Sequence, residues 1–156
     1  MRSARLATGR VHVLRLEEGE IVHEAVESFC RANGISCATV ALTGAVGAGS
    51  VIVSGPRVPI EDRIEPETIV LDAPCELAGS GTVFPDEGGS PVAHLHGAVG
   101  RKGFSAVGDL CHGMSVWLVM EAVVTELEGS GPVRRQSDPR LEGRLLEISR
   151  WHQRRY

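Results

Sequence analysis

Two histidines lie one residue apart in an otherwise apolar stretch, PVAHLHGAVG, at residues 91–100. Alternate residues of a β-strand project from the same face, so His94 and His96 would present two imidazoles to one point. Imidazole nitrogens are common zinc ligands, and sites built on sheets take further ligands from a neighbouring strand. The two residues are therefore candidates for part of a divalent-metal site, and the alternative is that they are packed or surface histidines.

A second stretch, VGDLCHG at residues 107–113, supplies three side chains that could complete this site. The sequence GRKG at residues 100–103 predicts a turn that folds this stretch back beside the first as a hairpin. Asp109 and Cys111 would share one face of the second strand, whereas His112 would point the other way unless a bulge reorients it. Asp109, Cys111 or His112 could therefore supply the third ligand.

Glu121 is the only charged residue in MSVWLVMEAVV, residues 114–124. A buried carboxylate must be paired, hydrogen-bonded or protonated. Glu121 could order a metal-bound histidine or act as a general base. It could equally face solvent, or contact an arginine across a subunit interface.

These side chains require a sheet to position them, and the hydrophobic pattern predicts one. In EIVHEAVESFCRANG the apolar residues recur at helical spacing and Gly34 stands where a helix ends, which predicts a helix over Glu20–Ala32. The stretch that begins at Val11 alternates like a strand ending at Gly19, with Val11 and Val13, and Leu16 as a further candidate, on its apolar face against His12, Arg15 and Glu17. Further strands are expected over residues 36–44, 50–55, 67–72, 76–84, 92–100, 104–110 and 114–129.

Strands that follow one another without intervening helices favour an antiparallel sheet, so the expected fold class is α+β with one main helix packed on the sheet. Residues 54–67 are rich in proline and charge and are a candidate flap. A short helix or strand is expected near the C-terminus. We expect one domain over residues 1–156, with a core at 10–148 and a basic tail at 149–156.

The composition excludes several classes of protein. Aromatic residues make up only 4% of the 156 residues, which disfavours base-stacking platforms for single-stranded nucleic acid. The net charge of −4 offers no general attraction to DNA. No apolar run is long enough to span a membrane, no secretory signal is evident, and the four cysteines form no CxxC motif. We therefore expect a cytoplasmic protein with reduced thiols and no membrane partner.

The order of these segments resembles the PPC (plants and prokaryotes conserved) domain over residues 10–148. The resemblance is carried by LEEGEIVHEAVESFCRANGI, ALTGAVGAGSV, ELAGSGTV, the His-x-His strand, and AVGDLCHGMSVWLVMEAVVTEL. It implies a PPC-like antiparallel sheet, assembly as a homotrimer and, as in many prokaryotic members, a histidine site for zinc. His94 and His96 match the family's His-x-His, whereas Asp109 stands where the family has a third histidine in a GGHL-like segment.

These observations leave two functional hypotheses and one purely structural alternative. The first is a trimeric PPC-domain protein with zinc or another divalent metal at His94, His96 and Asp109, and a regulatory role in binding a small anionic ligand or DNA. DNA binding is a family label, and this chain has no Arg-Gly-Arg-Pro AT-hook core. In the structural alternative, the histidines only order a trimer interface.

The second function is that of a metal-dependent hydrolase or lyase acting on a small carboxylate-bearing substrate. Glu121 would then carry a proton, and Arg57 or Arg63 on the candidate flap would hold the substrate carboxylate. The sequence leaves open whether the chain is an enzyme.

Overall fold

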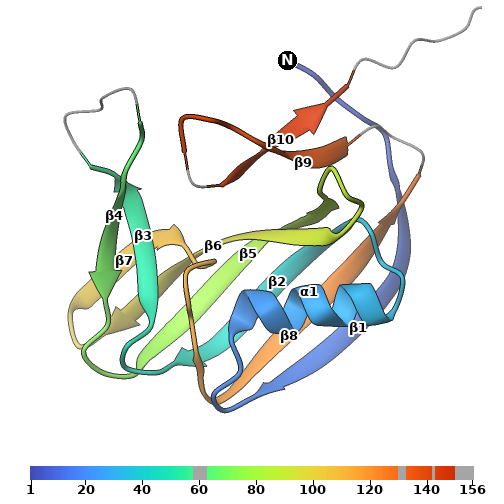
Figure 1. Ribbon diagram of the computed structural model, residues 1–156. Coiled ribbons are helices and arrows are strands. Elements are labelled where there is room, and N and C mark those ends of the chain that lie inside the picture. Colours follow the sequence, from blue (N-terminus) through green and yellow to red (C-terminus); the bar gives the residue numbers. More distant parts are fainter. Residues whose placement is uncertain (58–62, 130–132, 142, 150–156) are drawn as a thin grey trace, which may run out of the picture.

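A computed structural model describes residues 1–57, 63–129, 133–141 and 143–149 of the chain. Its described part is dominated by a mostly antiparallel sheet of eight strands in the order β1-β8-β2-β5-β6-β7-β3-β4, with one helix and a separate two-stranded hairpin (Figure 1). The elements are β1 (Ala7–Glu17), α1 (Val22–Ala32), β2 (Ala38–Val46), β3 (Val51–Pro56), β4 (Pro66–Val70), β5 (Cys75–Pro85), β6 (Pro91–Arg101), β7 (Phe104–Asp109), β8 (Val116–Glu128), β9 (Val133–Ser137) and β10 (Arg144–Ile148). The predicted combination of an antiparallel sheet and one main helix is confirmed.

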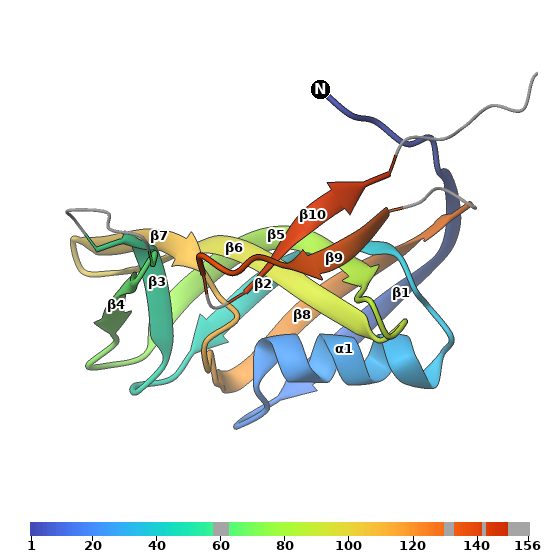
Figure 2. The ribbon, with the colours of Figure 1, turned by 45° about the horizontal axis from the view of Figure 1, so that its top comes forward.

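Helix α1 covers one face of the sheet (Figure 2). Val22, Val26 and Cys30 are fully buried against the sheet. The helix begins two residues later than the predicted Glu20, because Ile21 is extended and forms a bridge with Ser115. It ends at the predicted residue, and just beyond it Gly34 has a φ of 68°, which glycine adopts without a steric penalty.

The face assigned to β1 from the sequence was wrong for Leu16. Leu16 is 2% exposed and belongs to the core, whereas Val11 and Val13 are 59% and 76% exposed. Residues an odd number of positions apart in a regular strand lie on opposite faces, so Leu16 could not share a face with Val11. The valines lie on the sheet face opposite the helix, which is rich in apolar and small residues and for that reason resembled a core face.

The β9–β10 hairpin lies on the other side of the sheet from α1, near the end of β5 (Figure 2). The expected short C-terminal element is therefore a strand, β10. Its partner β9 was not predicted, because its sequence VRRQS contains two arginines and only one apolar residue.

The candidate flap joins β3 to β4, and its residues 58–62 lie outside the described residues, as do residues 150–156 of the tail. No helix in the described part of the chain is long and apolar enough to cross a membrane.

Candidate metal centre

Strands β6 and β7 bring the three favoured ligand residues together. The turn at residues 100–103 folds β7 back along β6, and the register places Asp109 directly opposite His96. His94 lies two residues before His96 on the same face of β6. The possible ligand atoms of His94, His96 and Asp109 all lie within 4.8 Å of one another.

The carboxylate of Asp109 lies between the two imidazoles and the backbone that follows it. Its Oδ2 is 3.9 Å from Nε2 of His94 and 3.7 Å from Nε2 of His96. Its Oδ1 accepts a 2.6 Å hydrogen bond from the backbone N–H of Cys111. This bond fixes the carboxylate and leaves Oδ2 directed at the histidines, whose rings stack with centroids 4.8 Å apart.

Two imidazole nitrogens and one carboxylate oxygen form a ligand set that suits zinc and similar divalent ions. Ligand atoms around tetrahedral zinc lie about 3.3 Å apart, given bond lengths of about 2.0–2.1 Å. The separations of 3.7 and 3.9 Å to Asp109 are slightly wider, and the group as a whole spans up to 4.8 Å, so the side chains would have to rotate inward to hold an ion. Three protein ligands would leave one position open for water or another molecule.

The electrostatic surroundings favour a neutral imidazole at His94. Burial lowers the pKa of His94, and the nearby charge of Arg135 lowers it further, whereas Asp109 opposes the shift. A histidine must be unprotonated at the coordinating nitrogen to bind a metal. The lowered pKa therefore keeps His94 available as a ligand at neutral pH.

The two alternative third ligands lie outside this group of three. The Cys111 thiol turns back to the edge of β6, 3.4 Å from the backbone nitrogen of Leu95 and 3.7 Å from the carbonyl oxygen of Ala93. Burial raises the pKa of Cys111 to about 12, so the thiolate needed for coordination is disfavoured. His112 is exposed on the loop after β7.

A cavity of about 300 Å³ adjoins the site. His94, Asp109 and His112 line it, and so does Arg135 of β9. Arg135 was not a candidate in the sequence analysis. Its only local signal is the alternation of Val133 and Arg135, which are both buried, and that signal is too short to reveal a buried arginine.

The remaining candidates lie elsewhere. Glu121 is exposed on the same sheet face as His96, but β2 and β5 lie between β8 and β6, so the two strands are roughly 14 Å apart. Arg57 lies 3.6 Å from Glu65 and 3.7 Å from Glu67, both on the β4 side of the hairpin.

Arg63 lines a separate cavity with Ile64, Glu65 and Pro66. Neither Arg63 nor Arg57 is among the described residues that line the cavity beside His94.

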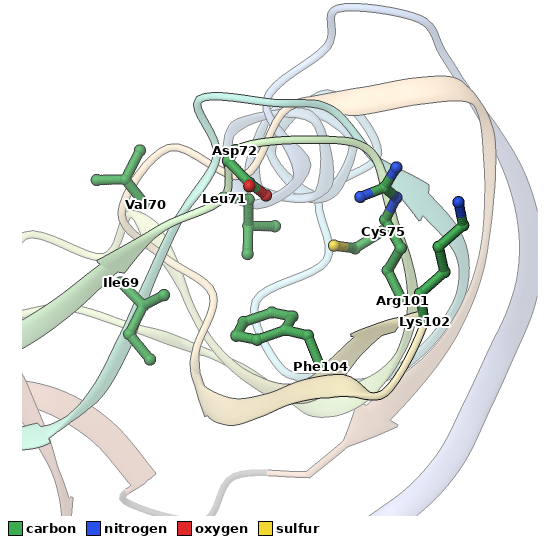
Figure 3. Close-up of a pocket in the computed structure, with 8 residues that line it drawn as sticks. All are labelled: Ile69, Val70, Leu71, Asp72, Cys75, Arg101, Lys102 and Phe104. Atoms are coloured by element: carbon green, nitrogen blue, oxygen red, sulfur yellow. The ribbon is translucent and has the colours of Figure 1, made fainter.

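Another cavity, of about 440 Å³, lies between β4 and the β6–β7 turn. Figure 3 shows Arg101 and Lys102 together on one side of it, with Phe104 and Asp72 on its walls. It contains none of the candidate site residues. Arg101 is exposed and is not among the described residues that line the cavity beside His94, so it serves below as a surface reference.

Comparison with known proteins adds a family and related folds. A family model described as the Plants and Prokaryotes Conserved (PCC) domain matches residues 4–128. A metal-containing protein from Archaeoglobus fulgidus is 26% identical, with a TM-score of 0.77 over 93% of this chain and 98% of that one. A plant- and prokaryote-conserved protein from Pyrococcus horikoshii is 25% identical, with a TM-score of 0.78 over 97% of this chain and 100% of that one.

A protein from Bacteroides thetaiotaomicron, described as a candidate DNA-binding protein, shares the fold at 19% identity, with a TM-score of 0.68 over 93% of this chain and 99% of that one. The search of curated proteins found no match.

Proposed function

The chain belongs to the Plants and Prokaryotes Conserved (PCC) domain family, and from that premise we propose that it binds one divalent metal ion, zinc by preference, through His94, His96 and Asp109. The observation that carries this proposal is the convergence of the three ligand atoms within 4.8 Å on adjacent strands. The related fold of a metal-containing protein from Archaeoglobus fulgidus supports it.

The proposed role of this site is regulatory, through reversible binding of a small anionic ligand at the open metal position. The neighbouring cavity of about 300 Å³ supports a ligand at the small end of the usual size range. The net charge of −4 gives no electrostatic support for DNA as the partner. A DNA-binding role would rest on the description of a structural neighbour that shares only the fold.

A metal-dependent lyase or hydrolase is the second candidate, and the same cavity favours it. When bound, the metal would polarise a substrate carbonyl or activate a water molecule. The residues of the chain would orient a carboxylate-bearing substrate against the site. Glu121, Arg57 and Arg63 are not among the described residues that line the cavity. An enzyme acting there would therefore have to use the residues that do line it, such as His112 and Arg135.

We further propose that the chain assembles as a homotrimer, as the family resemblance implies. The sheet face opposite α1 supports this proposal, because it carries exposed valines, and in the described part of the chain the β9–β10 hairpin lies over it near the end of β5. Apolar surface of this kind commonly marks a protein interface.

Elemental analysis of the purified protein tests the metal site. We expect about one equivalent of zinc per chain in the wild type, and loss of the metal in His94→Ala and Asp109→Asn, since each removes one ligand. His112→Ala is the matched control and should keep its zinc. Wild-type protein that takes up no zinc after loading, or an Asp109→Asn variant that binds zinc as tightly as wild type, would contradict the proposed ligand set.

A further inference from the structure

We propose that the cavity beside His94 and Asp109 binds a small carboxylate, and that Arg135 is the residue that holds its carboxylate group. This inference rests on the metal site proposed above and gives its open position a class of ligand. It also assigns a role to an arginine on β9, a strand that the sequence pattern did not reveal.

Arg135 is buried deeply for a charged residue, with only 4% of its surface exposed. One end of its guanidinium is anchored, because Nη2 donates a 2.7 Å hydrogen bond to Oγ1 of Thr82. The guanidinium also lies over the ring of Phe84, 5.6 Å from its centroid. These contacts hold the side chain in one orientation beside the cavity.

The guanidinium of Arg135 also carries an unsatisfied donor. Its Nε is buried and has no hydrogen-bond partner among the residues that the structure describes. No described carboxylate forms an ion pair with it. Leaving a buried charged donor unsatisfied is costly, so a buried arginine normally binds a carboxylate or phosphate. An anion in the cavity that Arg135 lines would contact its guanidinium and offset the unpaired charge.

The charges around the cavity favour the same kind of ligand. A bound divalent ion and Arg135 would outweigh the negative charges of Asp109 and Glu27, which also lines the cavity. Glu27 is already engaged, since its Oε1 accepts a 2.9 Å hydrogen bond from the backbone N–H of Ala93. The loaded cavity would therefore carry net positive charge, which an anionic ligand would neutralise.

The size and the other walls of the cavity restrict the ligand. Its volume of about 300 Å³ suits a short molecule, and Val92, Leu141 and Leu145 form its apolar side. Arg144 also lines the cavity, but its guanidinium lies 3.7 Å from Asp86 and 3.8 Å from Glu87. Arg135 is thus the better placed of these two cations to bind a carboxylate, with the apolar part of the ligand against the leucines.

Nuclear magnetic resonance of the Nε–H group of Arg135 tests the proposal directly in the wild-type protein. The resonance is assigned by its absence from Arg135→Lys, and acetate is titrated into metal-free and zinc-loaded protein, with acetamide as the uncharged control and inorganic phosphate as a second anion. We expect a saturable shift with acetate in the zinc-loaded form, a weaker response in the metal-free form, and none with acetamide. A larger response to phosphate than to acetate would overturn the assignment to carboxylates.

Substitutions of Arg135 measure how much the residue contributes to acetate affinity. Arg135→Met should raise the dissociation constant for acetate about ten- to a hundredfold, the usual effect of removing a charge-assisted hydrogen bond. Arg135→Lys should restore part of the affinity, because lysine keeps the charge but not the planar fork. Arg101→Met, which removes an exposed cation at the other cavity, should leave acetate binding unchanged.

The outcomes separate this inference from the metal proposal. If zinc binds normally but acetate leaves the Arg135 resonance unmoved in both forms, the carboxylate site is overturned and the metal site stands. If the wild type takes up no zinc while acetate still shifts the resonance, the metal site is overturned and the anion site stands. An Arg135→Met variant with a lower melting temperature but wild-type acetate affinity would show that Arg135 only anchors the hairpin.

Discussion

At the scale of single residues, the candidate centre depends on how closely two strands approach. Gly81 on β5 faces Leu95 on β6, between the two candidate histidines. A Cβ atom added at Gly81 would lie 2.1 Å from the carbonyl oxygen of His94. That atom belongs to the backbone and cannot rotate away, so only glycine allows β5 and β6 to pair at this point.

We therefore expect Gly81→Ala to lower the free energy of unfolding by about 1–3 kcal/mol, because overpacking displaces one strand. It should also weaken zinc binding by shifting His94. The matched control is Gly100→Ala on β6, where the nearest atom to an added Cβ is 3.5 Å away. Urea denaturation and zinc titration measure the two effects, and equal stability of both variants would contradict the close approach seen here.

At the scale of elements, α1 contributes its packing against the sheet and a buried thiol. Cys30 is fully buried on the apolar face of the helix. Burial raises its pKa from the ordinary value of 9.0 to about 11, with a smaller contribution from Glu27. The folded protein keeps this thiol protonated over a range of pH in which the unfolded chain releases the proton.

The higher pKa of Cys30 in the folded protein predicts a loss of stability at alkaline pH. The contribution of the protonated Cys30 thiol to the free energy of unfolding is fully present below pH 9 and is lost as the pH rises toward 11. The total loss is about 2–3 kcal/mol for a two-unit shift of the pKa. Cys30→Ala should reduce the slope of unfolding free energy against pH between these values, whatever its effect on stability at pH 7. An unchanged slope in chemical denaturation would show that Cys30 titrates alike in both states.

Most elements could be predicted from the sequence because their patterns are local. Helical spacing revealed α1, and the glycine turn at residues 100–103 predicted the hairpin that brings Asp109 beside His96. The outward face of β1 could not be predicted, because an apolar face that lies opposite the helix has the same alternation as a buried one. Arg135 was not predicted, because the burial of this charged residue depends on contacts with β5, which is distant in the sequence.

At the scale of the whole molecule, the candidate metal centre lies on the sheet face opposite α1, beside the β9–β10 hairpin. A continuous row of paired residues crosses six strands from β1 to β7: Val13, Val123, Ala41, Ser80, His96 and Asp109. The valine end of this row is exposed, with Val13 and Val123 exposed by 76% and 38%. The surface that we propose packs against other copies of the chain therefore extends to the candidate metal ligands.

We expect Val13→Glu to dissociate the proposed trimer, because it places a charge on the apolar surface that the copies would bury. Light scattering after gel filtration should give three times the chain mass for the wild type and one chain mass for Val13→Glu. Leu146→Glu on β10 is the matched control, since Leu146 is 46% exposed but lies on the hairpin rather than on the eight-stranded sheet. A wild type that is monomeric at all concentrations, or a Val13→Glu variant that stays trimeric, would contradict assembly through this face. Zinc retained by the monomeric variant would place the metal ligands within one chain, because every ligand would then survive the loss of the partners.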